Sequence, residues 1–315
     1  MARRALPAAL VAIATVGLIV LVAERWHDVA AAAVRIGPWA LVAAVVMHAL
    51  TLVLRSEAWR ICLAAAAPEG QPVPRRRAVH AANAAAYGVG VLQTHGALPT
   101  RVTVLRSLEG ERAPRPGQIA LCDAPIFLLE VAAAALVLAG AGLAGAVPGW
   151  VVAPATGLAA GGMLLAVVAR RRFGHRPTVR GLAVLAHRRL APQLALLVAG
   201  IAALTLARVA LLLGVAGAPH AAGDVALTFA MLGAAGLLPV GPNASPGATL
   251  AVAGGAGAAA ALAAGLAIAA SSLLAVMVYG AVTLGVTAAS STSATSATTR
   301  SRSSHRSSES AVRPR

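Results

Sequence analysis

Long apolar runs separated by short basic segments are the main pattern of the sequence. Residues 5–23 form an uninterrupted apolar run after Arg3 and Arg4, and residues 38–54 form a second run that ends in charged residues. Each run is close to the roughly 20 residues that a helix needs to cross the hydrocarbon core of a bilayer. A cleaved signal peptide is the alternative for the first run. Its length and the lack of a small-residue cleavage site before Glu24 favour a retained span.

Four further apolar runs predict four more spans, at residues 119–141, 149–169, 190–214 and 266–287. A mixed polar segment, residues 24–35, reads as a link between the first two spans. Cytoplasmic loops are enriched in Lys and Arg, so the arginine-rich loop between the fourth and fifth spans is expected to face the cytoplasm. The same rule places both termini in the cytoplasm. The sequence thus predicts an all-α, multi-pass protein of the cell inner (plasma) membrane.

Two other apolar segments are broken by glycine and proline. Residues 80–99 begin with His-Ala-Ala and end in Leu-Pro, and residues 220–239 repeat this pattern with the same spacing. Irregular backbone at bilayer depth is tolerated only where protein or a water-filled cavity surrounds it. We therefore expect two re-entrant broken helices that enter from opposite sides, as in inverted repeats whose substrate site lies near the midplane. A chance match in an alanine-rich chain is the alternative, and eight plain spans satisfy the charge pattern equally well.

Composition agrees with a membrane protein and changes how the charge is interpreted. The chain is 59% hydrophobic and only 11% charged, with a mean hydropathy of +0.80, whereas globular proteins are about 25% charged. The net charge of +16 lies in arginine clusters between apolar runs and in the tail, so no nucleic-acid partner is expected. Residues 1–287 are predicted to form a transmembrane domain. Residues 288–315, rich in Ser, Thr and Arg without an apolar period, are predicted to be a disordered cytoplasmic tail.

Signatures of familiar enzymes are missing from the sequence. It contains no phosphate-binding Gly-Lys-Ser/Thr loop, no His-Glu-x-x-His pair and no nucleophile elbow. Cys62 and Cys122 are the only cysteines, and two distant cysteines define neither a zinc site nor a disulfide framework. We therefore expect no enzyme, no metal and no cofactor. A membrane-embedded glycosyl or acyl transferase is the weakest alternative.

Ionisable residues inside the spans are the candidate site residues, because charge at bilayer depth is costly. Asp123 and Glu130 are seven residues apart, which places them on one face of the third span. Glu130 is deep in that span and needs a partner. One interpretation is structural: Arg208 or His48 pairs with a carboxylate and holds two helices together.

The other interpretation is a site for an anionic lipid head group. Arg208, His220 and the arginines near Pro99 would contact the head group, because the guanidinium fork matches phosphate geometry. The candidate lipid-binding residues lie at the end of the second span, inside the spans and in the two broken segments: Arg55, Arg60, Pro99, Arg101, Arg106, Glu130, Arg208, His220, Pro239, Ser245 and Gly247.

Four short motifs follow one another along the chain in a moderately specific order and spacing. They are Leu-Arg-Ser-Glu-Ala-Trp-Arg at residues 54–60, Leu-Pro-x-Arg at 98–101 leading to Arg106, the Asp123-to-Glu130 stretch, and Leu-Pro at 238–239 with Ser-Pro-Gly at 245–247. Over about residues 5–290 the chain resembles the transmembrane-region family of the lysylphosphatidylglycerol synthases. The resemblance implies a flippase-like domain that moves an aminoacylated phosphatidylglycerol made by a separate soluble domain. That synthase domain is absent, so the resemblance implies lipid translocation and no aminoacyl transfer.

The chain departs from the family pattern at two places. The family usually continues its Ser-Pro with glycines and an acidic residue, but residues 245–250 read SPGATL; it usually carries Gly-Glu after the first broken helix, but residues 100–103 read TRVT. Without these carboxylates, an anionic or isoprenoid-linked lipid is expected in place of a cationic one. The sequence predicts a lipid flippase or lipid-binding transporter whose partners are membrane lipids. The alternative is a non-transporting subunit that scaffolds a separate lipid- or envelope-modifying enzyme.

Overall fold

The computed structural model describes residues 16, 19–20, 22–67, 72–92, 96–173, 177–235, 244–253 and 257–309. Throughout these ranges the regular structure is helical and contains no strand. The elements in chain order are α2 (Trp26–Ala66), α3 (Arg76–Leu92), α4 (Ala97–Glu109), η2 (Gly110–Arg112), α5 (Pro116–Leu121), α6 (Asp123–Leu143), α7 (Gly149–Phe173), η3 (Pro177–Ala186), α8 (Leu190–Ala216), α9 (Ala222–Ala235), α10 (Ala244–Ala253) and α11 (Ala258–Glu309).

Five helical segments in the described ranges are long and apolar enough to cross a membrane. They are α2, α5 with α6 (Pro116–Leu143), α7, α8 and the first part of α11 (Ala258–Gly285). These segments contain the predicted runs from the second to the sixth, which confirms the all-α class and identifies a membrane protein. The first predicted run, residues 5–23, lies largely outside the described residues.

The link predicted at residues 24–35 is helical over most of its length and forms the first arm of α2. Its alanines favour helix despite the few charged residues among them. The actual break falls at Gly37, whose φ of 61° is left-handed and suits glycine, followed by Pro38 at the start of the next helical arm. Arg35 fixes the first arm: its Nη2 donates to the carbonyl oxygen of Ala216 at the end of α8 (2.8 Å).

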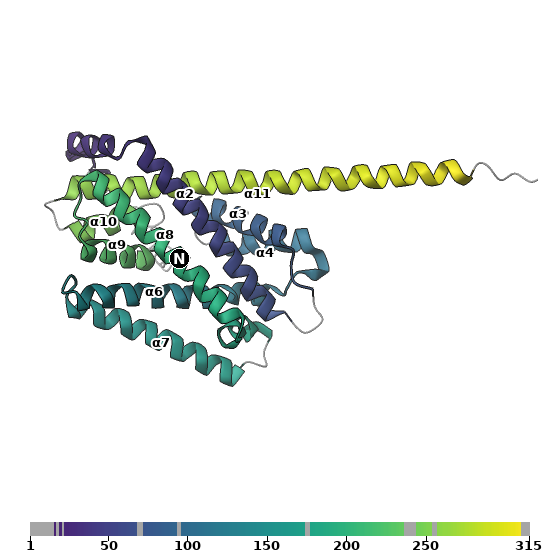
Figure 1. The fold of residues 1–315 in the computed structure, drawn as a ribbon, viewed down its shortest axis with the longest axis horizontal. Coiled ribbons are helices and arrows are strands. Elements are labelled where there is room, and N and C mark those ends of the chain that lie inside the picture. Colours follow the sequence, from purple (N-terminus) through teal and green to yellow (C-terminus); the bar gives the residue numbers. More distant parts are fainter. Residues whose placement is uncertain are drawn as a thin grey trace, which may run out of the picture.

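The bundle is built around α2, which packs along both α8 and α11. In Figure 1, α2 and α8 cross the middle of the bundle, the antiparallel pair α6–α7 lies on one side of them, and α11 lies on the other. One apolar core joins the start of α2 to the end of α8 and the start of α11. A second core joins the end of α2 to α3, α5, α6 and the start of α8.

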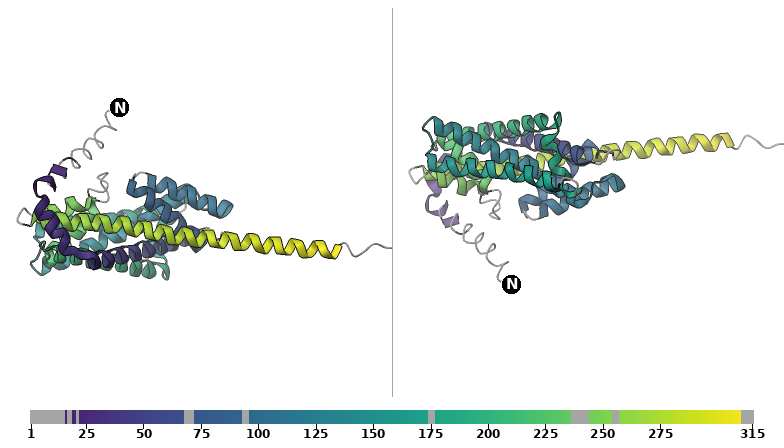
Figure 2. Two further views of the ribbon diagram at one scale, coloured as in Figure 1. Left: turned by 90° about the horizontal axis from the view of Figure 1, so that it is seen from above. Right: turned by 90° about the horizontal axis from the view of Figure 1, so that it is seen from below.

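Two helical hairpins complete the bundle. α3 packs along α4, α9 packs against α10, and α3 and α10 both pack on α11. Figures 1 and 2 show the α3–α4 hairpin and the α9–α10 hairpin toward opposite ends of the bundle. Each hairpin falls on a segment predicted to be broken, with His80 in α3 and Pro99 in the first turn of α4. Pro239 lies outside the described residues.

The two ends of the bundle differ in surface chemistry. At one end, Trp39 of α2 and Trp150 of α7 are exposed (83% and 78%). At the other end, which we call the basic end, exposed arginines occupy residues 75–77 before and within α3 and residues 170–172 in the last turn of α7. α11 extends beyond the bundle at this basic end (Figure 1).

The extension of α11 is helical as far as Glu309. The sequence from residue 286 to 309 contains neither glycine nor proline, so nothing in it interrupts a helix. Both figures show this part projecting away from the bundle, and an isolated polar helix is only marginally stable in water. The disorder predicted for residues 288–315 therefore stays a prediction.

Candidate functional site

Polar and charged side chains gather inside the bundle, where α2 meets α3, α6, α8 and α11. The buried polar residues of the described ranges are Thr51, Ser56, Asn83, Arg101, Glu109, Gln118, Arg208, Thr228, Thr249 and Ser271. Most of the surrounding residues are Ala, Leu and Val. An apolar bundle tolerates such groups only when they find partners, so their contacts define the candidate site.

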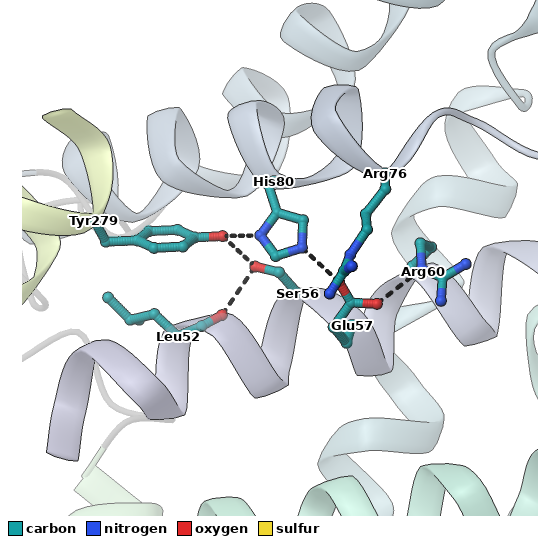
Figure 3. Close-up of polar contacts among 7 residues, drawn as sticks. All are labelled: Leu52, Ser56, Glu57, Arg60, Arg76, His80 and Tyr279. Atoms are coloured by element: carbon teal, nitrogen blue, oxygen red, sulfur yellow. Dashed lines mark hydrogen bonds and ion pairs between the residues drawn. The ribbon is translucent and has the colours of Figure 1, made fainter. Parts of the chain in front are cut away.

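The carboxylate of Glu57 on α2 is the centre of one polar network (Figure 3). One of its oxygens, Oε2, accepts a hydrogen bond from Nε of Arg60 (2.9 Å). The other, Oε1, accepts from Nε of Arg76 and from Nε2 of His80 (2.7 Å to the histidine). Glu57 thereby joins α2 to α3 through two nitrogen donors, those of Arg76 and His80, while Arg60 lies on α2 itself.

The network continues from His80 into the interior. Nδ1 of His80 lies 2.8 Å from the hydroxyl of Tyr279 on α11, and this hydroxyl lies 2.7 Å from Oγ of Ser56. Ser56 in turn donates to the carbonyl oxygen of Leu52 (2.9 Å). Figure 3 shows one continuous chain of contacts that leads from Glu57 to Leu52 through side chains of three helices. We call it the Glu57–Leu52 chain.

Two ion pairs connect α6 to its neighbours. Arg55 of α2 pairs with Glu130, and Arg101 of α4 pairs with Asp123. Both carboxylates of the predicted helix face are therefore used, and Glu130 has Arg55 as its partner, not Arg208 or His48. The side chains of Arg55 and Glu130 remain 40% and 23% exposed, so this pair is not sealed inside the bundle.

Arg101 also stacks on aromatic rings. Its guanidinium carbon lies 4.9 Å from the ring centroid of Trp59 and 5.9 Å from that of Tyr87, within the range of cation–π attraction. Trp59 is only 1% exposed, and its Nε1 has no hydrogen-bond partner. The contact places a charged group over the one tryptophan that is fully buried in the described ranges.

Arg208 of α8 is buried without a counter-ion. It is 5% exposed, its Nη1 donates to Oγ of Ser272 on α11 (3.0 Å), and its Nε has no partner. Within the described part of the chain no carboxylate pairs with it, and His48 lies within the electrostatic reach of both Arg208 and Arg55. Removing a cation from water without an anion costs several kcal/mol. Arg208 is therefore the group in the bundle most in need of an external anion.

The other predicted site residues do not converge on Arg208. His220 is exposed, its Nδ1 lies 2.9 Å from the carbonyl oxygen of Ala218, and its ring lies near Gly214. Gly214 is six residues beyond Arg208, about 9 Å along α8 and on a different face. The structure thus separates the histidine and the arginine that the sequence interpretation placed together.

Four other candidate residues, which lie in or just after the broken segments, contribute little to the polar interior. Pro99 and Arg106 of α4 are exposed, and Gly247 of α10 is exposed with open space around it. Ser245 accepts a hydrogen bond from Oγ1 of Thr249 through its carbonyl oxygen (3.1 Å). These four positions show no contact with the charged network.

Sequence reasoning did not select the Glu57–Leu52 chain as a site. Glu57 stands inside the motif of residues 54–60, and His80 opens the first broken segment, yet neither was a candidate. Tyr279 is one of only two tyrosines in the chain, and both lie close to the network, since their rings are 6.4 Å apart. A tyrosine is rare in this sequence, so its presence in an alanine-rich span was the signal that could have pointed to this network.

The fold and the site together define an all-helical membrane protein with an ionised network in its interior. No family model, no curated protein and no solved structure matches this chain. Within the described ranges, no three His, Cys, Asp or Glu side chains converge as metal ligands would. Its function has to be argued from the charged interior itself.

Proposed function

We propose that the protein binds a lipid with an anionic head group and moves it across the inner membrane, as a flippase or lipid-binding transporter. The observation that carries the proposal is Arg208, a buried guanidinium with an unpartnered Nε and no carboxylate. A phosphate oxygen is a strong acceptor for such a group and would offset its charge. Anionic lipids are the phosphate source that a membrane supplies.

The arrangement of charge favours movement over static binding. Arg55 lies seven residues from His48, about 10 Å along α2, and His48 lies within electrostatic reach of both Arg55 and Arg208. Arg55 is also partly exposed and forms an ion pair with Glu130. An anionic head group would pass from the basic end to Arg55 and then to Arg208, with the acyl chains remaining in lipid.

The proposal includes a topology. The basic end faces the cytoplasm by the positive-inside rule, so α3–α4 enters the membrane from the cytoplasm and α9–α10 from outside. This is the arrangement of an inverted repeat with two re-entrant hairpins. If residues 5–23 also cross, the protein has six spans with both termini inside. The resemblance to the lysylphosphatidylglycerol synthase transmembrane region supports the same assignment.

The test is lipid translocation in proteoliposomes. Fluorescent phosphatidylglycerol, phosphatidylcholine and a polyprenyl phosphate are followed by quenching from outside, in wild type, Arg208→Gln, Arg208→Lys and the exposed control Arg77→Gln. Hydrogen bonds to a charged group contribute about 1.5–3 kcal/mol, so Arg208→Gln should slow anionic lipid about 10- to 100-fold. The lysine variant should keep part of the rate, and the control should keep all of it.

Two outcomes contradict the proposal. If correctly inserted Arg208→Gln moves anionic lipid at the wild-type rate, the arginine is not the head-group site. If wild type moves none of the three lipids, the protein is not a flippase, and a non-transporting subunit that scaffolds a lipid- or envelope-modifying enzyme becomes the better proposal.

A further inference from the structure

The donors and acceptors of the Glu57–Leu52 chain constrain the protonation of His80. Glu57 contacts two guanidinium groups, so its carboxylate is ionised and only accepts. Nε2 of His80, 2.7 Å from that carboxylate, must therefore carry a hydrogen. Whether Nδ1, at the other side of the ring, carries a hydrogen depends on the rest of the Glu57–Leu52 chain.

The hydroxyl groups decide the state of Nδ1. Ser56 has one hydroxyl hydrogen, and it donates this hydrogen to the carbonyl oxygen of Leu52 (2.9 Å). The hydroxyl of Tyr279 must then donate to Oγ of Ser56 (2.7 Å), which leaves the tyrosine oxygen to accept from Nδ1 of His80 (2.8 Å). All four contacts are hydrogen-bonded only when both ring nitrogens carry a hydrogen, that is, when His80 is a cation.

Loss of one proton from His80 reverses the direction of the hydrogen bonds between His80, Tyr279 and Ser56. When Nδ1 of His80 gives its proton to water, the nitrogen lone pair becomes an acceptor for the hydroxyl of Tyr279. The tyrosine oxygen then accepts from Ser56, and Ser56 no longer donates to Leu52. One proton leaves, two hydroxyl groups rotate, and no other bond to hydrogen is broken. The chain between α11 and α2 thus has two hydrogen-bond directions that differ by one proton.

The chain is open to water at one side only. The side chains of Arg76 and Arg60 at its outer edge are 68% and 39% exposed, and those of Glu57 and His80 are 13% and 14% exposed. Tyr279 and Ser56 are closed off, at 5% and 0%. A proton therefore reaches His80 from the basic end and does not reach it through the inner end of the chain.

Charged and titratable groups contact His80 from two of the three helices that pack against α3. α2 supplies Glu57, with Arg60 bound to the same carboxylate, and α11 supplies Tyr279. α3 itself supplies Arg76.

The charged groups of the third neighbouring helix, α4, are mostly occupied elsewhere. Arg101 pairs with Asp123, Glu109 accepts from the backbone N–H of Arg75, and Arg106 is exposed. Glu57 is therefore the carboxylate that His80 contacts directly.

We propose that His80 is a proton-binding site and that its protonation controls lipid translocation. In both forms hydrogen bonds tie α11 to α2 and α3; in the neutral form the hydroxyl of Ser56 gives up its bond to Leu52 within α2 and donates to Tyr279 instead. Coupling to lipid movement rests on the function proposed above, whereas proton binding at His80 rests on the hydrogen-bond geometry of the Glu57–Leu52 chain. The site would take a proton as the coupling ion.

The first test reads the ring directly. Protein with ¹⁵N-labelled histidine in lipid nanodiscs is titrated by NMR, with His80→Gln to assign the signals. On raising the pH, Nδ1 should lose its proton while Nε2 keeps its own. Tyr279→Phe removes the acceptor for the Nδ1 proton, so it should lower the midpoint by about one pH unit, the tenfold effect of one net hydrogen bond. His27→Gln, an exposed histidine of α2, should leave the signals of His80 unchanged.

The second test reads transport. The translocation rate of fluorescent phosphatidylglycerol in proteoliposomes should change with the pH on the side of the basic end. This dependence should be lost in His80→Gln and kept in His27→Gln.

The outcomes separate the two proposals. The proton site is overturned if Nε2 of His80 carries no proton, or if the titration midpoint of His80 is the same in wild type and Tyr279→Phe. Active transport with the same pH profile in wild type and His80→Gln overturns the coupling. A wild type without transport overturns the flippase proposal and also the coupling, while the NMR result still decides whether His80 binds the proton.

Discussion

Replacing Glu57 by glutamine tests whether the carboxylate stabilises the bundle. Two of its partners are well exposed, with Arg76 at 68% and Arg60 at 39%, so each of those contacts contributes only about 0–1 kcal/mol. The contact with His80 is 13–14% exposed on both sides, and a hydrogen bond to a charged group at such a site contributes about 1.5–3 kcal/mol. Glutamine also turns an NH₂ group toward nitrogen donors. We expect Glu57→Gln to lower the free energy of unfolding by about 2–4 kcal/mol.

The measurement is a reversible unfolding titration in mixed micelles, followed by tryptophan fluorescence. Arg76→Gln is the matched control, because it removes the most exposed partner of the same carboxylate and should cost less than about 1 kcal/mol. If Glu57→Gln and Arg76→Gln lower stability equally, the buried contact with His80 carries no special weight and the reasoning fails.

Two further substitutions test packing. Arg101→Lys should lower stability by about 1–2 kcal/mol and shift the emission of Trp59, because an ammonium group does not reproduce the flat stacking of guanidinium on the ring; an unchanged unfolding midpoint and spectrum would contradict this. In Gly265→Ala the new Cβ would lie 2.4 Å from Oγ1 of Thr249, so α10 must move away from α11 at a cost of about 1–3 kcal/mol. Gly280→Ala has open space and should be neutral in the same thermal assay; equal effects of the two glycine changes would rule out the close approach of α10 and α11.

The helices could be predicted because the length of an apolar run is a local property of the sequence. Five runs became membrane-length helices, since a bilayer core sets the number of residues required. The link expected at residues 24–35 is itself helical, because its alanines favour helix despite the few charged residues among them. The local signal for the real break was present in the Gly37–Pro38 pair.

The polar interior could not be predicted in the same way. His80 contacts Glu57 from 23 residues away and Tyr279 from 199 residues away, and Arg55 reaches Glu130 across 75 residues. The hydrophobic pattern within one segment does not predict which distant helix will pack against it. The sequence did locate Asp123 and Glu130 on one helix face, because that relation depends on helix geometry alone.

On α7 and on α2, an exposed tryptophan and an arginine further along the helix are separated by a similar length. Trp150 and Arg170 are 20 residues apart, about 30 Å along the helix, and Trp39 and Arg60 on α2 are 21 residues apart, about 31 Å. Tryptophan prefers the level of the lipid head groups and arginine the water beyond them, and the hydrocarbon core of a typical bilayer is about 30 Å thick. The two helices therefore match the same bilayer thickness. A markedly thinner or thicker membrane would force the protein to tilt or would deform the lipid around it. The protein should therefore favour membranes, in the cell or in reconstituted lipid, whose hydrocarbon core is about as thick as this length.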